Sequence, residues 1–338
     1  MVGKTSGQKS SYQILEKIRR LVDSSEQLTS ISDVHYPGHA WSIVKLLLLG
    51  GWVYVYTTII PKYFDLYQYI DLLAGSGTMC VEETQDVVVG SAFIAHILAP
   101  KPFTNYVYVE QRKDRYDALL QRAAKLLGDK AQVLHGDCNQ LVGSILAVEG
   151  RVHSLVFIDN EGFNTSWGTM KALMEAETDI ILLFPTASVM RVSASERTWS
   201  ALDTFYGGPS WRDAKQEQDF LEIYLQQLQR EFRSLRKKEA YLSTVRVGTG
   251  QFYYDIALLC KGGPYVRAWD YLKKRLDWRD PRTIETALDI LKGRATQINW
   301  FTDLQEEVAS IRHGRHIEKY GKITLDEFLP KKGRGDYT

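Results

Sequence analysis

A short glycine turn after an apolar strand is the feature that most constrains this chain of 338 residues. The segment from Tyr69 to Leu73 is rich in β-forming and apolar residues and predicts a buried strand. The residues that follow, Ala74-Gly75-Ser76-Gly77, are small and suit a sharp turn or the close approach of a ligand. A plain structural turn and a nucleotide-binding loop fit this spacing about equally. Other parts of the sequence are needed to distinguish a structural turn from a nucleotide-binding loop.

Three later apolar segments each end in an acidic residue. Glu110 follows residues 107–109, Asp137 follows residues 133–136, and Asp159 follows residues 155–158. In open α/β sheets, ligands bind outside the carboxyl ends of the strands. The sequence therefore predicts one crevice that collects the glycine turn and the three acids.

This order of features resembles the class I S-adenosylmethionine-dependent methyltransferases, and more closely the three-Cys-motif partner protein family. The resemblance covers about residues 36–262 and is carried by Tyr69–Gly77, Gly90-Ser91, Gly136-Asp137, Phe157–Phe163, and Leu182–Pro185 with Arg191. It implies an α/β fold of the class I methyltransferase-like Rossmann type, with a seven-stranded sheet. Alternating segments at 241–247 and 252–260 independently indicate a C-terminal antiparallel hairpin.

The chain divides into three expected parts. Residues 1–35 read as a polar N-terminal extension, residues 36–262 as the methyltransferase-like domain, and residues 263–338 as a C-terminal helical extension rich in charge. The family name refers to cysteines in another protein, so the resemblance also implies a cysteine-motif partner protein.

Composition places few limits on the partners. The chain has 42 basic and 41 acidic residues, which gives no overall attraction to nucleic acid or to an anionic membrane. Its three cysteines lack metal-ligand spacing, and we expect no metal site. Residues 43–60 approach membrane-spanning length, but the interior Lys45 and Gly50-Gly51 favour a core helix that breaks into a second segment. With no apolar signal core, we expect a cytoplasmic protein without a membrane span.

The resemblance implies S-adenosylmethionine as the cofactor, with a defined set of contacts. Its expected binding residues are Asp71, Ala74, Gly75, Ser76 and Gly77 around the turn, Glu110 and Gln111 at the ribose, and Asp137 and Cys138 at the adenine. Proteins that bind a nicotinamide dinucleotide also hold its ribose with an acidic residue at this position. The turn lacks the full Gly-x-Gly-x-x-Gly pattern, however, because Cys80 occupies the last glycine position.

The loop that begins at Asp159 is the expected catalytic segment. In amino-directed methyltransferases, a loop of this kind holds an exocyclic amine by polar groups while an aromatic ring stacks on the acceptor. Asp159, Asn160 and Phe163 match those roles, and Glu161 adds a carboxylate that could be a base or a specificity contact. The family usually has Asp-Pro where this chain has Asp159-Asn160, which loosens the loop and leaves a catalytically inactive fold open.

Three further residues are candidates for substrate binding. Lys45 is four residues after Trp41 and on the same helix face, Ser91 begins an apolar segment after Gly90, and Arg191 follows the fifth predicted strand. Each also has a structural interpretation: a solvated lysine beside a packed tryptophan, a helix cap, and a surface arginine.

These predictions lead to one expected function and several alternatives. The expected function is an S-adenosylmethionine-dependent methyltransferase that methylates an exocyclic amine, most plausibly on a nucleic acid. The alternatives are a non-catalytic partner or adaptor of a cysteine-motif protein, a nicotinamide-dependent oxidoreductase, and a methyltransferase acting on protein or on a small molecule.

Overall fold

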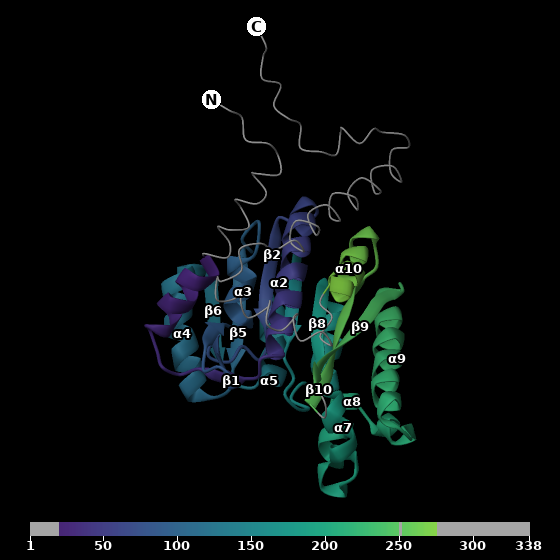
Figure 1. Ribbon diagram of the computed structural model, residues 1–338. Helices are drawn as coiled ribbons and strands as arrows, with labels where there is room; N and C mark the ends of the chain where they lie inside the picture. Colours follow the sequence, from purple (N-terminus) through teal and green to yellow (C-terminus); the bar gives the residue numbers. More distant parts are fainter. Residues whose placement is uncertain (1–19, 250–251, 276–338) are drawn as a thin grey trace.

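The computed structural model describes residues 20–249 and 252–275, and a seven-stranded sheet forms its centre (Figure 1). The strands run in the order β6-β5-β2-β7-β8-β10-β9. Their bounds are β2 (Leu66–Asp71), β5 (Asn105–Glu110), β6 (Ala131–His135), β7 (Val152–Ile158), β8 (Thr178–Phe184), β9 (Ala240–Thr249) and β10 (Phe252–Lys261). The first five are parallel, while β10 runs antiparallel to both β8 and β9. The predicted seven-stranded sheet with its C-terminal hairpin is confirmed.

The strand order reverses at β2. From β2 the chain adds β5 and β6 on one side and then crosses to add β7 and β8 on the other. At such a reversal the connections leave in opposite directions and open a crevice at the carboxyl edge of the sheet. Asp71, Glu110 and Ile158 end the three central strands at that edge.

Helices cover both faces of the sheet, as Figure 1 shows for α2 on one face and for α4 and α9 at its two sides. One hydrophobic cluster packs α2 (Ser42–Ile59), α3 (Ser91–Ile97), α4 (Lys113–Leu127) and α10 (Arg267–Arg275) against the sheet. A second cluster contains α5 (Cys138–Leu146), α6 (Trp167–Glu175), α7 (Thr186–Ser193), α8 (Trp199–Tyr206) and α9 (Glu217–Arg236). The period-2 alternation of strand side chains separates the clusters, because Tyr69 belongs to the first and Ile70 to the second. Short 3₁₀ turns lie at Ile60–Lys62, Gly128–Lys130, Glu196–Thr198, Pro209–Asp213 and Pro264–Val266.

The apolar helix α2 packs as a core helix. The helical stretch Ser42–Lys62 is long and apolar enough to cross a membrane, but 89% of its most apolar window is buried inside the protein. The expected break at Gly50-Gly51 is wrong, because α2 runs through both glycines. A Cβ at Gly50 would meet Leu98 at 2.5 Å, and one at Gly51 would meet Leu272 at 2.6 Å. The pair therefore allows close packing of neighbouring segments rather than ending the helix.

A small second sheet lies beside the carboxyl edge of the main one. It consists of β1 (Tyr36–Gly38), β3 (Thr78–Val81) and β4 (Val87–Val89), in the order β1-β3-β4. Strand β1 pairs parallel with β3, and β3 forms an antiparallel hairpin with β4. The glycine turn after β2 thus leads into a strand, and the acidic stretch after it is the turn of a hairpin.

Arg122 of α4 fastens the N-terminal segment to this region. Its side chain is 0% exposed, and its guanidinium donates to four backbone carbonyl oxygens at 2.6–2.9 Å. Three of these carbonyls belong to Leu28, Ser32 and Val34, and the fourth belongs to Ser76 of the glycine turn. Burial lowers the pKa of Arg122 to about 10, so the group remains charged at neutral pH.

The proposed domain boundaries remain predictions. Leu21 and Leu28, before the first boundary, and Trp269 and Leu272, after the second, belong to the same hydrophobic cluster as the sheet. The other helices expected after residue 275 lie outside the described residues.

Replacing Arg122 by Met should destabilise the protein strongly. The change keeps an apolar stem but removes the guanidinium and with it four hydrogen bonds to backbone carbonyl oxygens. We expect the free energy of unfolding to fall by about 3–5 kcal/mol, as when one partner of a buried charged network is removed. Chemical denaturation followed by tryptophan fluorescence measures this.

The matched control is Arg233→Met on α9. Arg233 forms an ion pair with Glu239 in which both side chains are about 60% exposed. We expect a change below about 1 kcal/mol there. A similar loss for both variants would show that the four buried bonds of Arg122 do not matter.

Candidate functional site

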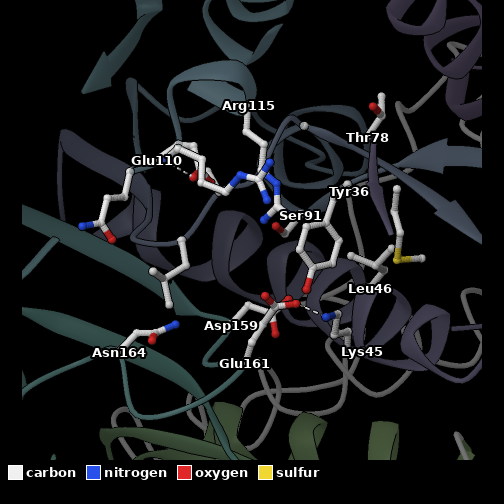
Figure 2. Close-up of a pocket in the computed structure, with 18 residues that line it drawn as sticks. Tyr36, Lys45, Leu46, Thr78, Ser91, Glu110, Arg115, Asp159, Glu161 and Asn164 are labelled. Carbon is white, nitrogen blue, oxygen red and sulfur yellow. Dashed lines mark hydrogen bonds and ion pairs between the residues drawn. The ribbon is translucent and has the colours of Figure 1, made fainter. Parts of the chain in front are cut away.

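A cavity of about 220 Å³ lies at the carboxyl ends of the central strands (Figure 2). Its lining includes these residues predicted from the sequence: Lys45, Ala74, Gly75, Gly77, Ser91, Glu110, Gln111, Asp159 and Glu161. We call it the first cavity. Segments far apart in the chain therefore supply the side chains that the sequence predicted to lie together.

The glycine turn forms one wall of the first cavity. Gly75 and Gly77 have φ values of +61° and +82°, a conformation that residues with a Cβ rarely adopt. A Cβ on Gly77 would also meet the Phe93 ring at 2.3 Å. Ser76 does not line the cavity: its side chain is buried, and its hydroxyl donates to the carbonyl of Thr78 at 3.1 Å. The turn therefore presents backbone rather than side chains to the cavity.

Glu110 is held in place while part of its carboxylate stays free. Its side chain is 8% exposed, and Oε1 accepts a hydrogen bond from the backbone N–H of Arg112 at 2.7 Å. Gln111 beside it is exposed and also lines the cavity. A fixed carboxylate with an unused oxygen can accept hydrogen bonds from a pair of ligand hydroxyls.

Besides Ser76, three expected cofactor residues lie outside the lining. Asp71 is fully buried, and burial raises its pKa to about 7. Asp137 caps α5 by accepting from the backbone N–H of Asn139 at 2.9 Å. Cys138 is buried, which raises the pKa of its thiol to about 12. These residues support the walls of the crevice instead of facing the first cavity.

A second cavity of about 370 Å³ adjoins the first. Its wall contains many aromatic side chains and a mixture of charges. The lining residues include Tyr36, His39, Trp41, Ser42, Lys45, Glu82, Asp159, Asn160, Glu161, Leu183, Pro185, Arg191, Tyr253 and Tyr254. At the rim, His39 stacks on Trp41 with 4.1 Å between the ring centroids. This composition suits a small, flat, polar ligand.

The two cavities share a wall made by Tyr36, Lys45, Asp159 and Glu161. Lys45 and Asp159 form an ion pair in this wall, which Figure 2 marks with a dashed line. Their side chains are 7% and 16% exposed. The pair joins α2 to the end of β7 and lies where contents of the two cavities would face each other.

The expected catalytic residues of the Asp159 loop do not all face the cavities. Glu161 lines both cavities; its side chain is exposed overall, and the partial burial of its carboxylate raises its pKa. Asn160 is 3% exposed and accepts from the hydroxyl of Thr165 at 2.8 Å. Phe163 lines neither cavity, because it packs edge-on against Phe205 in the second hydrophobic cluster. Its expected stacking on an acceptor does not fit this position.

The predicted substrate-binding residues divide between the cavities. Lys45 lines both, Ser91 lines the first, and Arg191 lines the second. Arg191 is exposed at α7 and donates to the Ser188 hydroxyl at 3.2 Å. Among the described residues, no group of three His, Cys, Asp or Glu side chains could hold a metal ion.

Several lining residues were missed from the sequence. Tyr36 reaches the site through the long-range pairing of β1 with β3, which leaves no local signal. The Arg115 guanidinium lies 4.7 Å from the centroid of the Tyr36 ring (Figure 2). Tyr254 was within reach of prediction, because a hairpin antiparallel to β8 must begin at the carboxyl edge, and Asp255 there pairs with Phe184.

Among the comparisons with known proteins, only the search of solved structures finds similar proteins. Searches with protein-family models and among curated proteins return no match. Among solved structures, protein LPL1258 of Legionella pneumophila is 13% identical with a TM-score of 0.43, covering 76% of this chain and 94% of that one. An O-methyltransferase of Bacillus cereus, solved with S-adenosylhomocysteine, is 13% identical with a TM-score of 0.37, covering 77% and 93%. TomG, an O-methyltransferase of Streptomyces achromogenes solved with S-adenosylmethionine, is 11% identical with a TM-score of 0.36, covering 72% and 98%.

The chain has the class I methyltransferase-like fold. That conclusion stands on the strand order and the reversed C-terminal hairpin, because similarities at this level carry no argument about activity.

The buried Asp71 should make stability depend on pH in a defined direction. Its folded-state pKa of about 7 exceeds the usual 3.8, so the folded protein keeps a proton that the unfolded chain releases. The free energy of unfolding therefore falls as pH rises from about 4 to about 7. Asp71→Asn should be more stable than the wild type at pH 8, by roughly 1–3 kcal/mol, and the gap should narrow toward pH 5.

Denaturation of both proteins at pH 5 and pH 8 measures the difference in their free energies of unfolding. Groups that titrate alike in both proteins cancel in this difference. Asp114→Asn, at an exposed carboxylate paired with Arg112, should show no gain at pH 8. An Asp71→Asn variant that is less stable than the wild type at pH 8 would contradict the expectation.

Proposed function

We propose that this protein is an S-adenosylmethionine-dependent methyltransferase, with the cofactor in the first cavity and the acceptor in the second. The observation that carries the proposal is the shared wall: Lys45, Asp159 and Glu161 line both cavities at the carboxyl edge of the sheet. Methyl transfer needs a donor and an acceptor held in line at short range, and adjoining cavities provide that placement.

The residues of the first cavity fit this cofactor. Backbone at Gly75 and Gly77 allows close approach, and the unused oxygen of Glu110 suits the ribose hydroxyls. When bound, the cofactor supplies a methyl group on a positively charged sulfur.

The turn geometry argues against the nicotinamide alternative. In a dinucleotide site, the glycine turn opens a helix whose N-terminus holds the pyrophosphate. Here the turn leads into strand β3, and α3 begins only at Ser91, beyond the hairpin. The turn therefore lacks the direct strand–turn–helix connection of a dinucleotide site, although the backbone N–H of Gly90, which precedes α3, donates to the carbonyl of Gly77 at 2.9 Å.

Glu161 is the carboxylate best placed to take the acceptor's proton. Lys45 engages Asp159, whereas no hydrogen bond or ion pair to Glu161 occurs within the described residues. A raised pKa also makes Glu161 a stronger base than an ordinary glutamate. In this arrangement Lys45 and Asp159 orient the reactants, and Glu161 removes the proton.

The acceptor class needs direct measurement. The exocyclic amine of a nucleic acid, expected from the Asp159 loop, remains a proposal, and the position of Phe163 does not support it. A labelled-methyl screen should therefore contain DNA, RNA, protein, and small amines and phenols. It should be run with and without a cysteine-motif partner. Cofactor binding without transfer in every arm would favour the adaptor alternative.

Calorimetric titration tests the cofactor assignment first. The wild type should bind S-adenosylmethionine and S-adenosylhomocysteine, and Glu110→Gln should weaken both about 10- to 100-fold through the loss of charged hydrogen bonds. Glu196→Gln, at an exposed glutamate outside both cavities, is the control and should bind normally. A wild type that binds neither compound, alone or with a partner, would refute the proposal.

Glu161→Gln tests the proton acceptor. We expect the rate of methyl transfer to the acceptor found in the screen to fall about 10²- to 10⁴-fold, with cofactor affinity unchanged. A base acts only when deprotonated, so the wild-type rate should fall as pH drops through the Glu161 pKa, which lies above 4.5. The variant should lack this acid limb. An unchanged pH profile in Glu161→Gln would assign the base elsewhere.

A further inference from the structure

The deep end of the second cavity holds a buried amide with an unused polar atom. The Asn160 side chain is 3% exposed, and its Oδ1 accepts from the Thr165 hydroxyl. Its Nδ2 has no hydrogen-bond partner within the described residues. A buried donor without a partner destabilises the protein, and a ligand atom that accepts this N–H would remove that cost.

The Tyr254 hydroxyl is a second polar group directed at the same region. Its oxygen is shielded from solvent and forms no well-formed hydrogen bond with any residue that the structure describes, although the Ser42 hydroxyl lies near it. Burial raises the pKa of Tyr254, and the charge of Asp159 raises it further, so the hydroxyl stays protonated and can donate. Both Tyr254 and Ser42 line the second cavity.

Lys45 adds a charged donor at this point. Its ammonium has three N–H groups, and Asp159 is its ion-pair partner. The Nζ atom lies 6.0 Å from the centroid of the Tyr254 ring. Donors from α2, from the Asp159 loop and from β10 therefore converge beside the wall between the cavities.

Of the acceptors on these residues, Asp159 Oδ2 and Asn160 Oδ1 are already used within the protein, and the Glu161 carboxylate remains to take a proton. Asp159 is engaged by Lys45, and Oδ1 of Asn160 is engaged by Thr165. A primary amine would need acceptors for two N–H groups, whereas an oxygen that develops negative charge needs donors. The excess of hydrogen-bond donors at this end of the cavity favours an oxygen atom as the methyl acceptor.

Resting on the proposed function, we infer that the methyl acceptor is an oxygen: the hydroxyl of a small planar ring, a phenol or an enol. The aromatic wall formed by Trp41, Tyr253 and Tyr254 suits such a ring. Asn160, Tyr254 and Lys45 donate to the acceptor oxygen as it becomes negative. Glu161 receives its proton.

The step balances without another reagent. A bond forms between the acceptor oxygen and the methyl carbon while the carbon–sulfur bond breaks. The sulfur keeps that electron pair and becomes a neutral thioether. The hydroxyl proton passes to Glu161 and then to solvent.

Matched pairs of small probes test the acceptor atom. Phenol and aniline, catechol and 1,2-diaminobenzene, and 4-hydroxybenzoate and 4-aminobenzoate differ only in oxygen against nitrogen. Each is titrated into protein saturated with S-adenosylhomocysteine, and transfer from labelled S-adenosylmethionine is measured in parallel. The oxygen member should bind about tenfold or more tightly in at least one pair, and methyl should go to oxygen.

Asn160→Asp converts the donor into an acceptor of the same shape and keeps the bond from Thr165. It should weaken the phenols about tenfold or more and reduce or reverse the preference for oxygen. Tyr254→Phe keeps the ring and should weaken the phenols without reversing the preference. Asn105→Asp, at the start of β5 on the opposite edge of the sheet, is the matched control and should change neither.

The results separate this inference from the function on which it rests. Failure of the wild type to bind S-adenosylhomocysteine would refute the methyltransferase proposal before any probe is added. If the wild type binds it, equal or better binding of the nitrogen members would overturn the oxygen assignment. Absence of binding by both series would also overturn it. If Asn160→Asp no longer binds S-adenosylhomocysteine, Tyr254→Phe alone carries the comparison.

Discussion

The site depends on one buried guanidinium that is bound by carbonyl oxygens alone. Arg122 ties the segment containing Leu28, Ser32 and Val34 to the carbonyl of Ser76 in the glycine turn. Its planar fork reaches several acceptors at once, which a lysine ammonium could not do in the same geometry. By fixing both segments to α4, Arg122 sets the position of β1, and β1 carries Tyr36 into both cavities. The N-terminal segment is thus part of the candidate site.

Close packing around the small sheet and the turn requires glycine at two positions. A Cβ on Gly38 would meet the Met79 sulfur at 2.3 Å, and one on Gly90 would meet the Gly77 carbonyl at 3.0 Å. Strand β1 can lie against the Met79 side chain of β3, and the start of α3 against the glycine turn, only because these positions lack side chains. The turn after β2 therefore serves two purposes: it leaves room for a ligand on one side and lets the small sheet pack on the other.

Local sequence predicted individual strands, the C-terminal hairpin and part of the site, while the family resemblance implied the complete fold. Apolar strands ending in Glu110 and Asp159 predicted the parallel order, and the carboxyl-edge rule placed both at the first cavity. The rule does not say which way a side chain points. Asp71 turns inward into the core, and Asp137 is used as a helix cap. Phe163 was assigned from a motif, yet the aromatic cluster around Phe205 holds it elsewhere. Tyr36 depends on a pairing across about forty residues that no local pattern encodes.

The Lys45–Asp159 pair is better explained by reactivity than by stability, because buried ion pairs seldom stabilise a fold more than apolar side chains would. In the proposed reaction, the positive charge on sulfur disappears. A lone Asp159 carboxylate beside that sulfur would stabilise the charged reactant more than the neutral product, and would raise the barrier. With Lys45 paired to it, Asp159 presents a nearly neutral group to the sulfur, while the ammonium still faces an acceptor oxygen that becomes negative. In the proposed reaction the pair would therefore favour the transition state from both cavities, which would explain its place in the wall between them.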